Sequence, residues 1–333
     1  MSYTARPSRR RFLAATGAAG ITGLAPFTRA FAQGYPARPV RLVNGFPAGG
    51  AGDTIARMLA AHLGQSLGQP VVVENRPGAS GTIAAGQVAK ADPDGYTIYL
   101  GSASEFSHAR SAMGSRLAYN PESDFHPIRI LVRLPLMLVA HPSLSVSTVK
   151  QLLDLAQSKP GALNYASFGN GSTPHIAGEV FNLKTGSKLV HVPYKGSAPA
   201  MTDVLAGRVP LIFDTVAYSY PHVKAGALKA LAVASDRRVP LAREIPTMVE
   251  AGVPDFRIES WLGLFCQAKT PPFVVEALSA ASSQFINSVE TRSKLEGMGF
   301  IVDGAGPDVA RAFIQQETVR MSKLIADSGV RFE

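Results

Sequence analysis

Short apolar runs alternate with stretches of helical periodicity after residue 35. Residues 40–46 alternate apolar and polar side chains before turning apolar, as a buried strand does. Residues 53–63 place apolar side chains three and four positions apart, which predicts a helix. A short strand at 71–73, a helix of small residues at 82–90 and a third strand at 96–100 follow. This strand and helix order is typical of a largely parallel sheet.

The same order returns further along the chain. The predicted strands are 136–140, 163–167, 189–192, 209–214, 228–234 and 258–266, and the predicted helices are 147–156, 174–184, 198–205, 218–225, 272–289 and 307–326. No low-complexity linker and no fixed-period repeat separates the two series. We therefore expect an α/β fold of two packed lobes joined by crossovers.

Composition narrows the functional class. The 333 residues carry a formal net charge of +9, but five arginines and no acidic residue lie in residues 1–32. Without that segment, Lys and Arg number 28 against 24 Asp and Glu, which leaves +4 in scattered positions. This distribution disfavours nucleic-acid binding. A single cysteine, Cys266, excludes an intramolecular disulfide, and no apolar run reaches the ~20 residues of a membrane span.

The first 32 residues have the three parts of an export signal. Ser8 to Leu13 resembles a twin-arginine motif, and the weakly apolar residues 14–24 follow it. The small residues of Ala30-Phe31-Ala32 form an A-x-A cleavage site. We expect cleavage near Ala32, a mature chain that begins at Gln33, and a location in the periplasm.

Two glycine-containing loops each lie between a predicted strand and a predicted helix. The first covers residues 46–53 and the second covers residues 167–175. Glycines allow a ligand to approach the backbone, and free N–H groups at a helix start attract anions. Neither loop has the spacing of a P-loop or of a dinucleotide fingerprint. One such loop in each lobe favours a ligand bound between the lobes.

Motifs spread over residues 35–306 resemble the Bug family, the substrate-binding proteins of tripartite tricarboxylate transporters. The matching segments are Tyr35-Pro36, residues 47–57, 73–78 and 94–97, Tyr165-Ala166-Ser167 with Gly169 and Gly171-Ser172, residues 191–196, Pro246-Thr247, residues 250–252 and 261–264. Their order along the chain argues against chance.

The resemblance implies a type II periplasmic-binding-protein fold that closes on a small organic acid. It implies one lobe of residues 33–135 plus 262–333 and a second lobe of 136–261. It implies no catalysis, cofactor or metal, and it implies docking of a monomer on membrane subunits of a transporter. By motif, the ligand would contact Phe46, Ala48, Gly49, Asp53, Ser102, Ser167, Gly169, Asn170, Ser172, Thr173, His175, Asp214 and Thr215.

Several roles stay open at the level of sequence. Asp214 would accept a hydrogen bond from a ligand amine or hydroxyl, or cap the helix that follows. His175 would contact the ligand or make a structural hydrogen bond. An exported hydrolase using Ser172, His175 and Asp214 is a rival class, although no G-x-S-x-G elbow is present. An extracytoplasmic sensor for the same acid fits the same residues. Whether the acid is a tricarboxylate, a dicarboxylate, an amino acid or an aromatic acid stays open as well.

Overall fold

Parallel strands connected by helices form the first half of the fold. The computed structural model describes residues 1–2 and 34–328 of the chain. β1 (Val40–Asn44) pairs in parallel with β2 (Val71–Asn75) on one side and with β3 (Thr97–Ser102) on the other. α1 (Ala51–Leu67) and α2 (Thr82–Ala89) are the crossovers. The sequence pattern placed all five elements, because buried parallel strands read as apolar runs between amphipathic helices.

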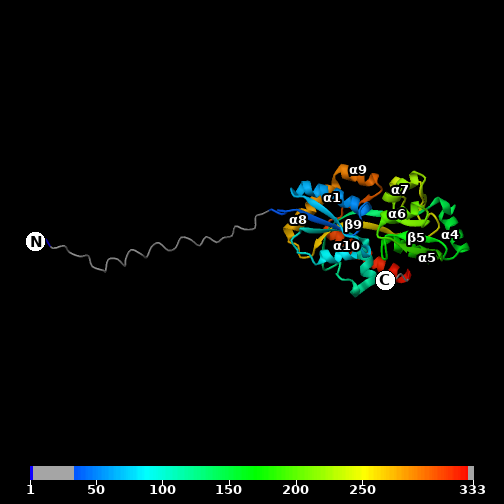
Figure 1. The fold of residues 1–333 in the computed structure, drawn as a ribbon, viewed down its shortest axis with the longest axis horizontal. Coiled ribbons are helices and arrows are strands. Elements are labelled where there is room, and N and C mark those ends of the chain that lie inside the picture. Colours follow the sequence, from blue (N-terminus) through cyan, green and yellow to red (C-terminus); the bar gives the residue numbers. More distant parts are fainter. Residues whose placement is uncertain (3–33, 329–333) are drawn as a thin grey trace. The chain divides into compact units, whose positions relative to one another are not determined.

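A second parallel group repeats this arrangement. β5 (Asn164–Ser167) lies between β6 (Val190–Pro193) and β7 (Leu211–Thr215), and both pairings are parallel. Its helices are α4 (Val149–Ser158), α5 (Thr173–Thr185), α6 (Ser197–Leu205) and α7 (Val216–Lys224). Figure 1 shows these four helices gathered around β5. The two halves have separate apolar cores.

Two antiparallel strands connect the halves. β4 (Phe125–Ala140) pairs with β9 (Glu259–Gln267) up to Pro135, and from Leu136 onward it pairs with β7. β8 (Lys229–Val233) and β10 (Ile301–Val302) also pair with β4, while β9 pairs with β3. The strands follow the order β2-β1-β3-β9-β4-β7-β5-β6. This is the two-lobed mixed α/β fold that the sequence predicted.

The strand predicted at 136–140 is only the last part of β4, and the residues of β4 before 136 were not predicted as a strand. Pro127 and Pro135 lie in this part, and proline usually argues against a central strand because it donates no ladder hydrogen bond. The register shifts between Pro127 and Arg129 and again between Ile130 and Val132. These irregularities accommodate Pro127 within the sheet.

One of the two predicted C-terminal helices also departs from the prediction. A single helix was expected at 272–289, but α8 (Pro272–Asn287) ends before Ser288, whose side chain caps α9 (Val289–Gly297) by accepting from the Thr291 N–H. α10 (Pro307–Ser328) then reaches the second half, since Met321 and Ile325 belong to its apolar core. Two short helical elements, η3 (Ser104–His108) and α3 (Ala109–Met113), were not predicted at all.

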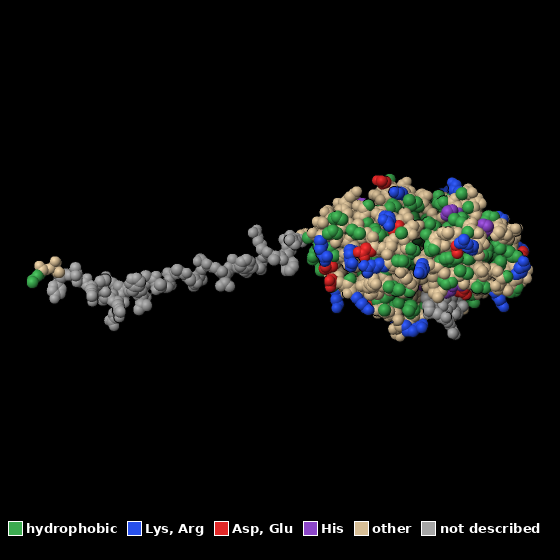
Figure 2. Space-filling view, viewed as in Figure 1, with side chains coloured by type: hydrophobic (Ala, Val, Ile, Leu, Met, Phe, Trp, Pro, Cys, Tyr) green, Lys and Arg blue, Asp and Glu red, His purple; other side chains and the backbone are tan. Residues whose placement is uncertain are grey.

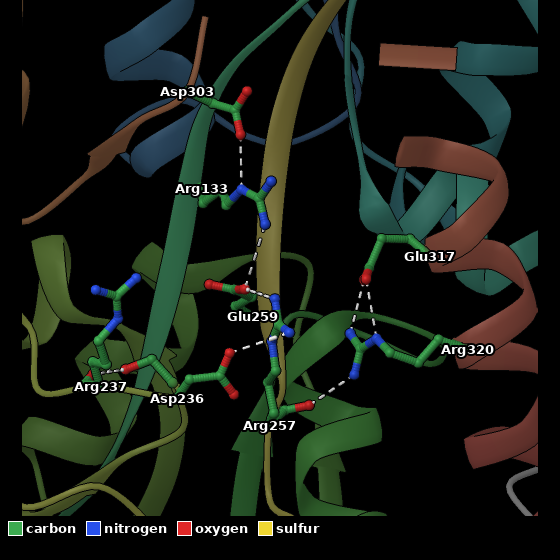
Figure 3. A network of polar contacts seen from close by, with 9 residues as sticks. Arg133, Asp236, Arg237, Arg257, Glu259, Asp303, Glu317 and Arg320 are labelled. Atoms are coloured by element: carbon green, nitrogen blue, oxygen red, sulfur yellow. Dashed lines mark hydrogen bonds and ion pairs between the residues drawn. The ribbon is translucent and has the colours of Figure 1, made fainter. Parts of the chain in front are cut away.

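A chain of ion pairs lies beside the crossing strands (Figure 3). Glu259 on β9 is 3.0 Å from the Arg257 guanidinium and 3.9 Å from that of Arg133 on β4. Arg133 also bonds Asp303, and Arg257 bonds Asp236, which follows β8. These contacts tie the crossing strands to segments of both halves.

The predicted twin-arginine motif and the cleavage site near Ala32 lie outside the described residues. Within residues 34–328, no helix is long and apolar enough to cross a membrane. On the face drawn in Figure 2, Lys and Arg side chains lie at several separate places, some next to acidic side chains.

Candidate ligand-binding site

Strand ends from both halves surround one cavity. Its walls come from the segments after β1, β5 and β6, from the carboxyl ends of β3 and β7, and from residues of β4 and β9, the two strands that run between the halves. The lining residues are Phe46, Pro47, Gly50, Ala51, Gly52, Ser102, Ser104, Leu134, Leu136, Phe168, Thr173, Pro174, Ser197, Ala198, Asp214, Thr215, Ser260 and Leu262. We call this space the inner cavity. It lies at the carboxyl ends of parallel strands, where open α/β sheets bind ligands.

Four helices begin at this cavity. α1, α5, α6 and α7 start at Ala51, Thr173, Ser197 and Val216, and each contributes a lining residue from its first turn or its N-cap. The free N–H groups and the positive end of the helix dipole favour an anion at such positions. Asp214 is the one ionisable side chain among the described residues of the lining. The cavity therefore attracts an anion through backbone groups, without Lys or Arg.

Thr173 lines the inner cavity with a hydroxyl group that makes no hydrogen bond within the protein. The N-cap of α5 is Ser172, and Thr173 is the first helical residue. Thr173 is 2% exposed, and its Oγ1 has no hydrogen-bond partner. A buried hydroxyl without a partner is costly, so this atom needs a partner from the cavity.

Asp214 is fully buried at the end of β7. Its Oδ2 accepts from the Ser197 hydroxyl at 2.8 Å, and its Oδ1 accepts from the Thr215 N–H at 2.6 Å. Burial raises the pKa of Asp214 to about 7, although the hydrogen bonds from Ser197 and Thr215 oppose the rise. No ion pair of the described residues includes Asp214. Asp214 therefore lies against the cavity with hydrogen-bond donors beside it but no cationic partner among the described residues.

Glu105 is a second buried acid, and sequence reasoning missed it. It accepts from the backbone N–H and the hydroxyl of Ser102 and, at 2.7 Å, from the Tyr99 hydroxyl. Burial raises its pKa despite these hydrogen bonds. Glu105 thereby holds Ser102 at the end of β3, where Ser102 faces the cavity.

Asp53 braces the first glycine loop from within. The N-cap of α1 is Gly50, and Asp53 lies in the first turn of the helix. Its carboxylate accepts from the Gly49 N–H at 3.1 Å, from Arg57 at 2.9 Å and from Asn75 at 2.7 Å. Burial alone would raise the pKa of Asp53, but these hydrogen bonds outweigh it and lower the pKa. Asp53 thus shapes the loop without lining the cavity.

The second glycine loop is braced by histidines. His175 Nδ1 accepts from the Gly171 N–H at 3.0 Å, and its ring stacks on His191 at 3.9 Å between centroids. Ser167 Oγ lies 2.5 Å from His191 Nε2. Burial lowers the pKa of His175 to about 3 and that of His191 to about 4. Both rings are therefore neutral near pH 7.

The hydrolase arrangement is absent from the described residues. The Ser172 hydroxyl donates to the Gly169 carbonyl at 2.7 Å rather than to His175. Asp214 bonds Ser197 and Thr215, so it does not orient the His175 ring.

A second cavity of about 300 Å³ adjoins the first and shares Phe46, Ser104 and Phe168 with it. We call it the outer cavity. Gly169 and Asn170 line it, as does the exposed Lys195. At this wall the two halves meet, because the Ser80 hydroxyl donates to the Asn170 carbonyl at 2.7 Å.

The predicted site residues therefore fall into three groups. Phe46, Ser102, Thr173, Asp214 and Thr215 line the inner cavity, Gly169 and Asn170 line the outer cavity, and Ala48, Gly49, Asp53, Ser167, Ser172 and His175 line neither. Sequence reasoning missed Ser197 and Ala198. Their signal was available, because Gly196 directly precedes a helical pattern after a predicted strand.

A family model described as tripartite tricarboxylate transporter family receptor matches residues 55–330. The chain belongs to this family. It is 33% identical over 302 residues to Protein BugT of Bordetella pertussis, an alignment that covers 91% of this chain and 93% of BugT. The predicted resemblance to the Bug family is thus confirmed.

Solved structures of family members have the same fold. R. palustris Rpa4515 with adipate has a TM-score of 0.86 and 36% identity, and the alignment covers 89% of this chain and 99% of that one. MatC from Rhodopseudomonas palustris with bound malate has a TM-score of 0.83 and 32% identity, covering 87% and 100%. This family consists of periplasmic solute receptors, so the chain is a binding protein and not an enzyme.

Proposed function

We propose that this protein captures a small carboxylate in the inner cavity and presents it to the membrane subunits of a tripartite transporter. The observation that carries the proposal is the meeting of four helix N-termini with the unpartnered Thr173 hydroxyl at one buried cavity. The adipate and malate bound by the two similar structures are carboxylates, which supports this ligand class.

The proposal includes a division into lobes. Residues 33–135 plus 262–333 form one lobe and 136–261 the other, and the lobes close on the ligand as a hinge. The pairing of β4 supports this boundary. Up to Pro135 this strand pairs with β9, and from Leu136 onward it pairs with β7. α10 packs Met321 and Ile325 against the second half and Ala310 and Ile314 against an apolar cluster of the first half, so we expect this helix to follow the motion.

We also propose that the mature protein begins near Gln33, works in the periplasm and acts as a monomer. The family's periplasmic receptors support the location. Among the predicted contacts, we assign direct ligand binding to Phe46, Ser102, Thr173, Asp214 and Thr215. Gly169 and Asn170 would serve the outer cavity, while Ala48, Gly49, Asp53, Ser167, Ser172 and His175 hold the two loops.

A thermal-shift screen against small carboxylates and their neutral amides tests the binding function. A ligand at a hundred times its dissociation constant adds ~2.7 kcal/mol to the free energy of unfolding, so the melting temperature rises. We expect shifts with acids and none with amides. Because backbone groups hold the anion, the shift should change little between low and moderate salt.

Thr173→Val is the matched variant, since it removes the hydroxyl and keeps the shape of the side chain. We expect it to weaken acid binding by about fivefold, as for loss of one hydrogen bond. Thr202→Val is its control, because Thr202 is exposed on α6 and bonds only a carbonyl of its own helix. A protein that responds to no acid, or that responds equally to the amides, would contradict the proposal.

A further inference from the structure

The inner cavity has two chemically different sides. The helix starts offer hydrogen-bond donors, whereas the end of β7 offers the carboxylate of Asp214. A ligand with negative charge alone would complement the donors and would be repelled by Asp214. The side of the cavity formed by Asp214 is therefore complementary to a different group on the same ligand.

The hydrogen bonds that Asp214 already accepts indicate the kind of group that a ligand would place beside it. The Ser197 hydroxyl hydrogen is used in its bond to Asp214 Oδ2. The backbone N–H of Thr215 is used in its bond to Oδ1. With both hydrogens committed to Asp214, the Ser197 oxygen presents a lone pair, and the carboxylate presents lone pairs in its ionised form.

Across the cavity, the Ser102 hydroxyl is committed in the same way. Its hydrogen is used by Glu105, a fully buried acid. Two serines that line the cavity are thus both oriented by buried carboxylates and turn acceptor sites toward it. The charged wall at Asp214 is the stronger of the two, because hydrogen bonds to a charged group are stronger than those to a neutral one.

We propose that the acid bound here carries a hydrogen-bond donor, a hydroxyl or an ammonium group, close to its carboxylate, and that Asp214 and Ser197 accept from it. The inference rests on the proposed function and specifies its substrate class as hydroxy or amino acids. An unsubstituted diacid has no donor for Asp214 and Ser197. Its binding would exclude water from these acceptors without replacing the lost hydrogen bonds, so it binds more weakly.

Isothermal titration with two matched series tests the proposal. The first series is succinate, malate and aspartate, and the second is adipate, 2-hydroxyadipate and 2-aminoadipate, so that chain length is varied separately from the donor. We expect the hydroxy or amino acid of at least one series to bind about tenfold more tightly than its unsubstituted parent. Equal binding of parent and substituted acids in both series would overturn the proposal.

Asp214→Asn then identifies the group responsible. The amide oxygen can still accept from Thr215 and from a ligand hydroxyl, but it carries no charge. We expect the preference for a donor to fall to about threefold or less, and an ammonium ligand to lose more affinity than a hydroxyl ligand. Asp154→Asn, on the exposed face of α4, is the matched control and should keep the wild-type order.

Two results separate this proposal from the proposed function. Binding of carboxylates with no preference for a donor overturns the substrate class and leaves the receptor function standing. Binding of no carboxylate overturns both. A preference that persists in Asp214→Asn, in protein with the wild-type melting profile, shows that another group selects the donor and overturns the role of Asp214. The titrations of the wild-type protein decide the substrate class even where that variant folds poorly.

Discussion

At the scale of single residues, the interior of the fold contains an acid whose burial changes its titration. Asp214 is fully buried, and burial raises its pKa from the ordinary 3.8 to about 7. Between these two values the folded protein holds a proton that the unfolded chain has released. Stability is therefore greater at the acidic end of this window and falls as the pH rises through it.

Asp214→Asn should remove this pH dependence. At pH 8 the ionised carboxylate costs up to ~4 kcal/mol of stability relative to the unfolded chain, and an amide carries no such cost. We expect the free energy of unfolding of the variant to rise relative to wild type between pH 4 and pH 8, measured by urea unfolding. Asp154→Asn is the control and should run parallel to wild type, since Asp154 is exposed. A constant difference between wild type and Asp214→Asn at the two pH values would contradict the assignment.

At the scale of elements, α5 is held against β5 by a contact that tolerates no side chain. A Cβ added at Gly178 would lie 2.1 Å from a ring carbon of Tyr165, a fully buried residue. That ring is held in place, because its hydroxyl donates to Glu179 at 2.6 Å and the ring stacks on His191 at 5.2 Å. The position of α5, and with it the Thr173 hydroxyl, thus depends on a glycine.

Gly178→Ala should destabilise the fold by ~1–3 kcal/mol through overpacking, measured by chemical denaturation. Gly297→Ala in α9 is the matched control, since a Cβ there meets no atom within 4 Å. It should be neutral or stabilise by up to ~1 kcal/mol, as alanine favours a helix over glycine. Equal effects of the two substitutions would show that α5 can move away from Tyr165.

At the scale of the whole described unit, the two halves meet at the outer cavity as well as at the crossing strands. The bond from Ser80 to the Asn170 carbonyl joins the turn after β2 to the loop after β5. The backbone at Ser80 has a φ of 51°, a left-handed conformation that a serine adopts at some cost. We therefore expect this hydrogen bond to stabilise the closed arrangement of the two halves.

Ser80→Ala should weaken ligand binding about fivefold, because a bond between the halves contributes ~1 kcal/mol only when they are closed. The loss should appear as faster ligand release in stopped-flow measurements. Ser158→Ala is the control, since the Ser158 hydroxyl makes a similar bond to the Leu155 carbonyl at the end of α4. Unchanged release from Ser80→Ala would exclude this contact from closure.

The sequence by itself determined the parallel strands, the crossover helices, the two glycine loops and, through its motifs, the family. These features are local: a strand buried on both faces is a run of apolar residues, and a helix has its own period. Only the tertiary structure decided which of the predicted polar groups face the cavity and which support the loops. Ser102 faces it because Glu105 holds its hydroxyl, and Ser197 because Asp214 does. The first part of β4 likewise became a strand through pairing with β9, more than a hundred residues away, despite its prolines. Hydrogen bonds between distant segments leave no period in the sequence, so Ser197 and Glu105 emerged only from the fold, whereas the family motifs had already nominated Asp214 and Ser102.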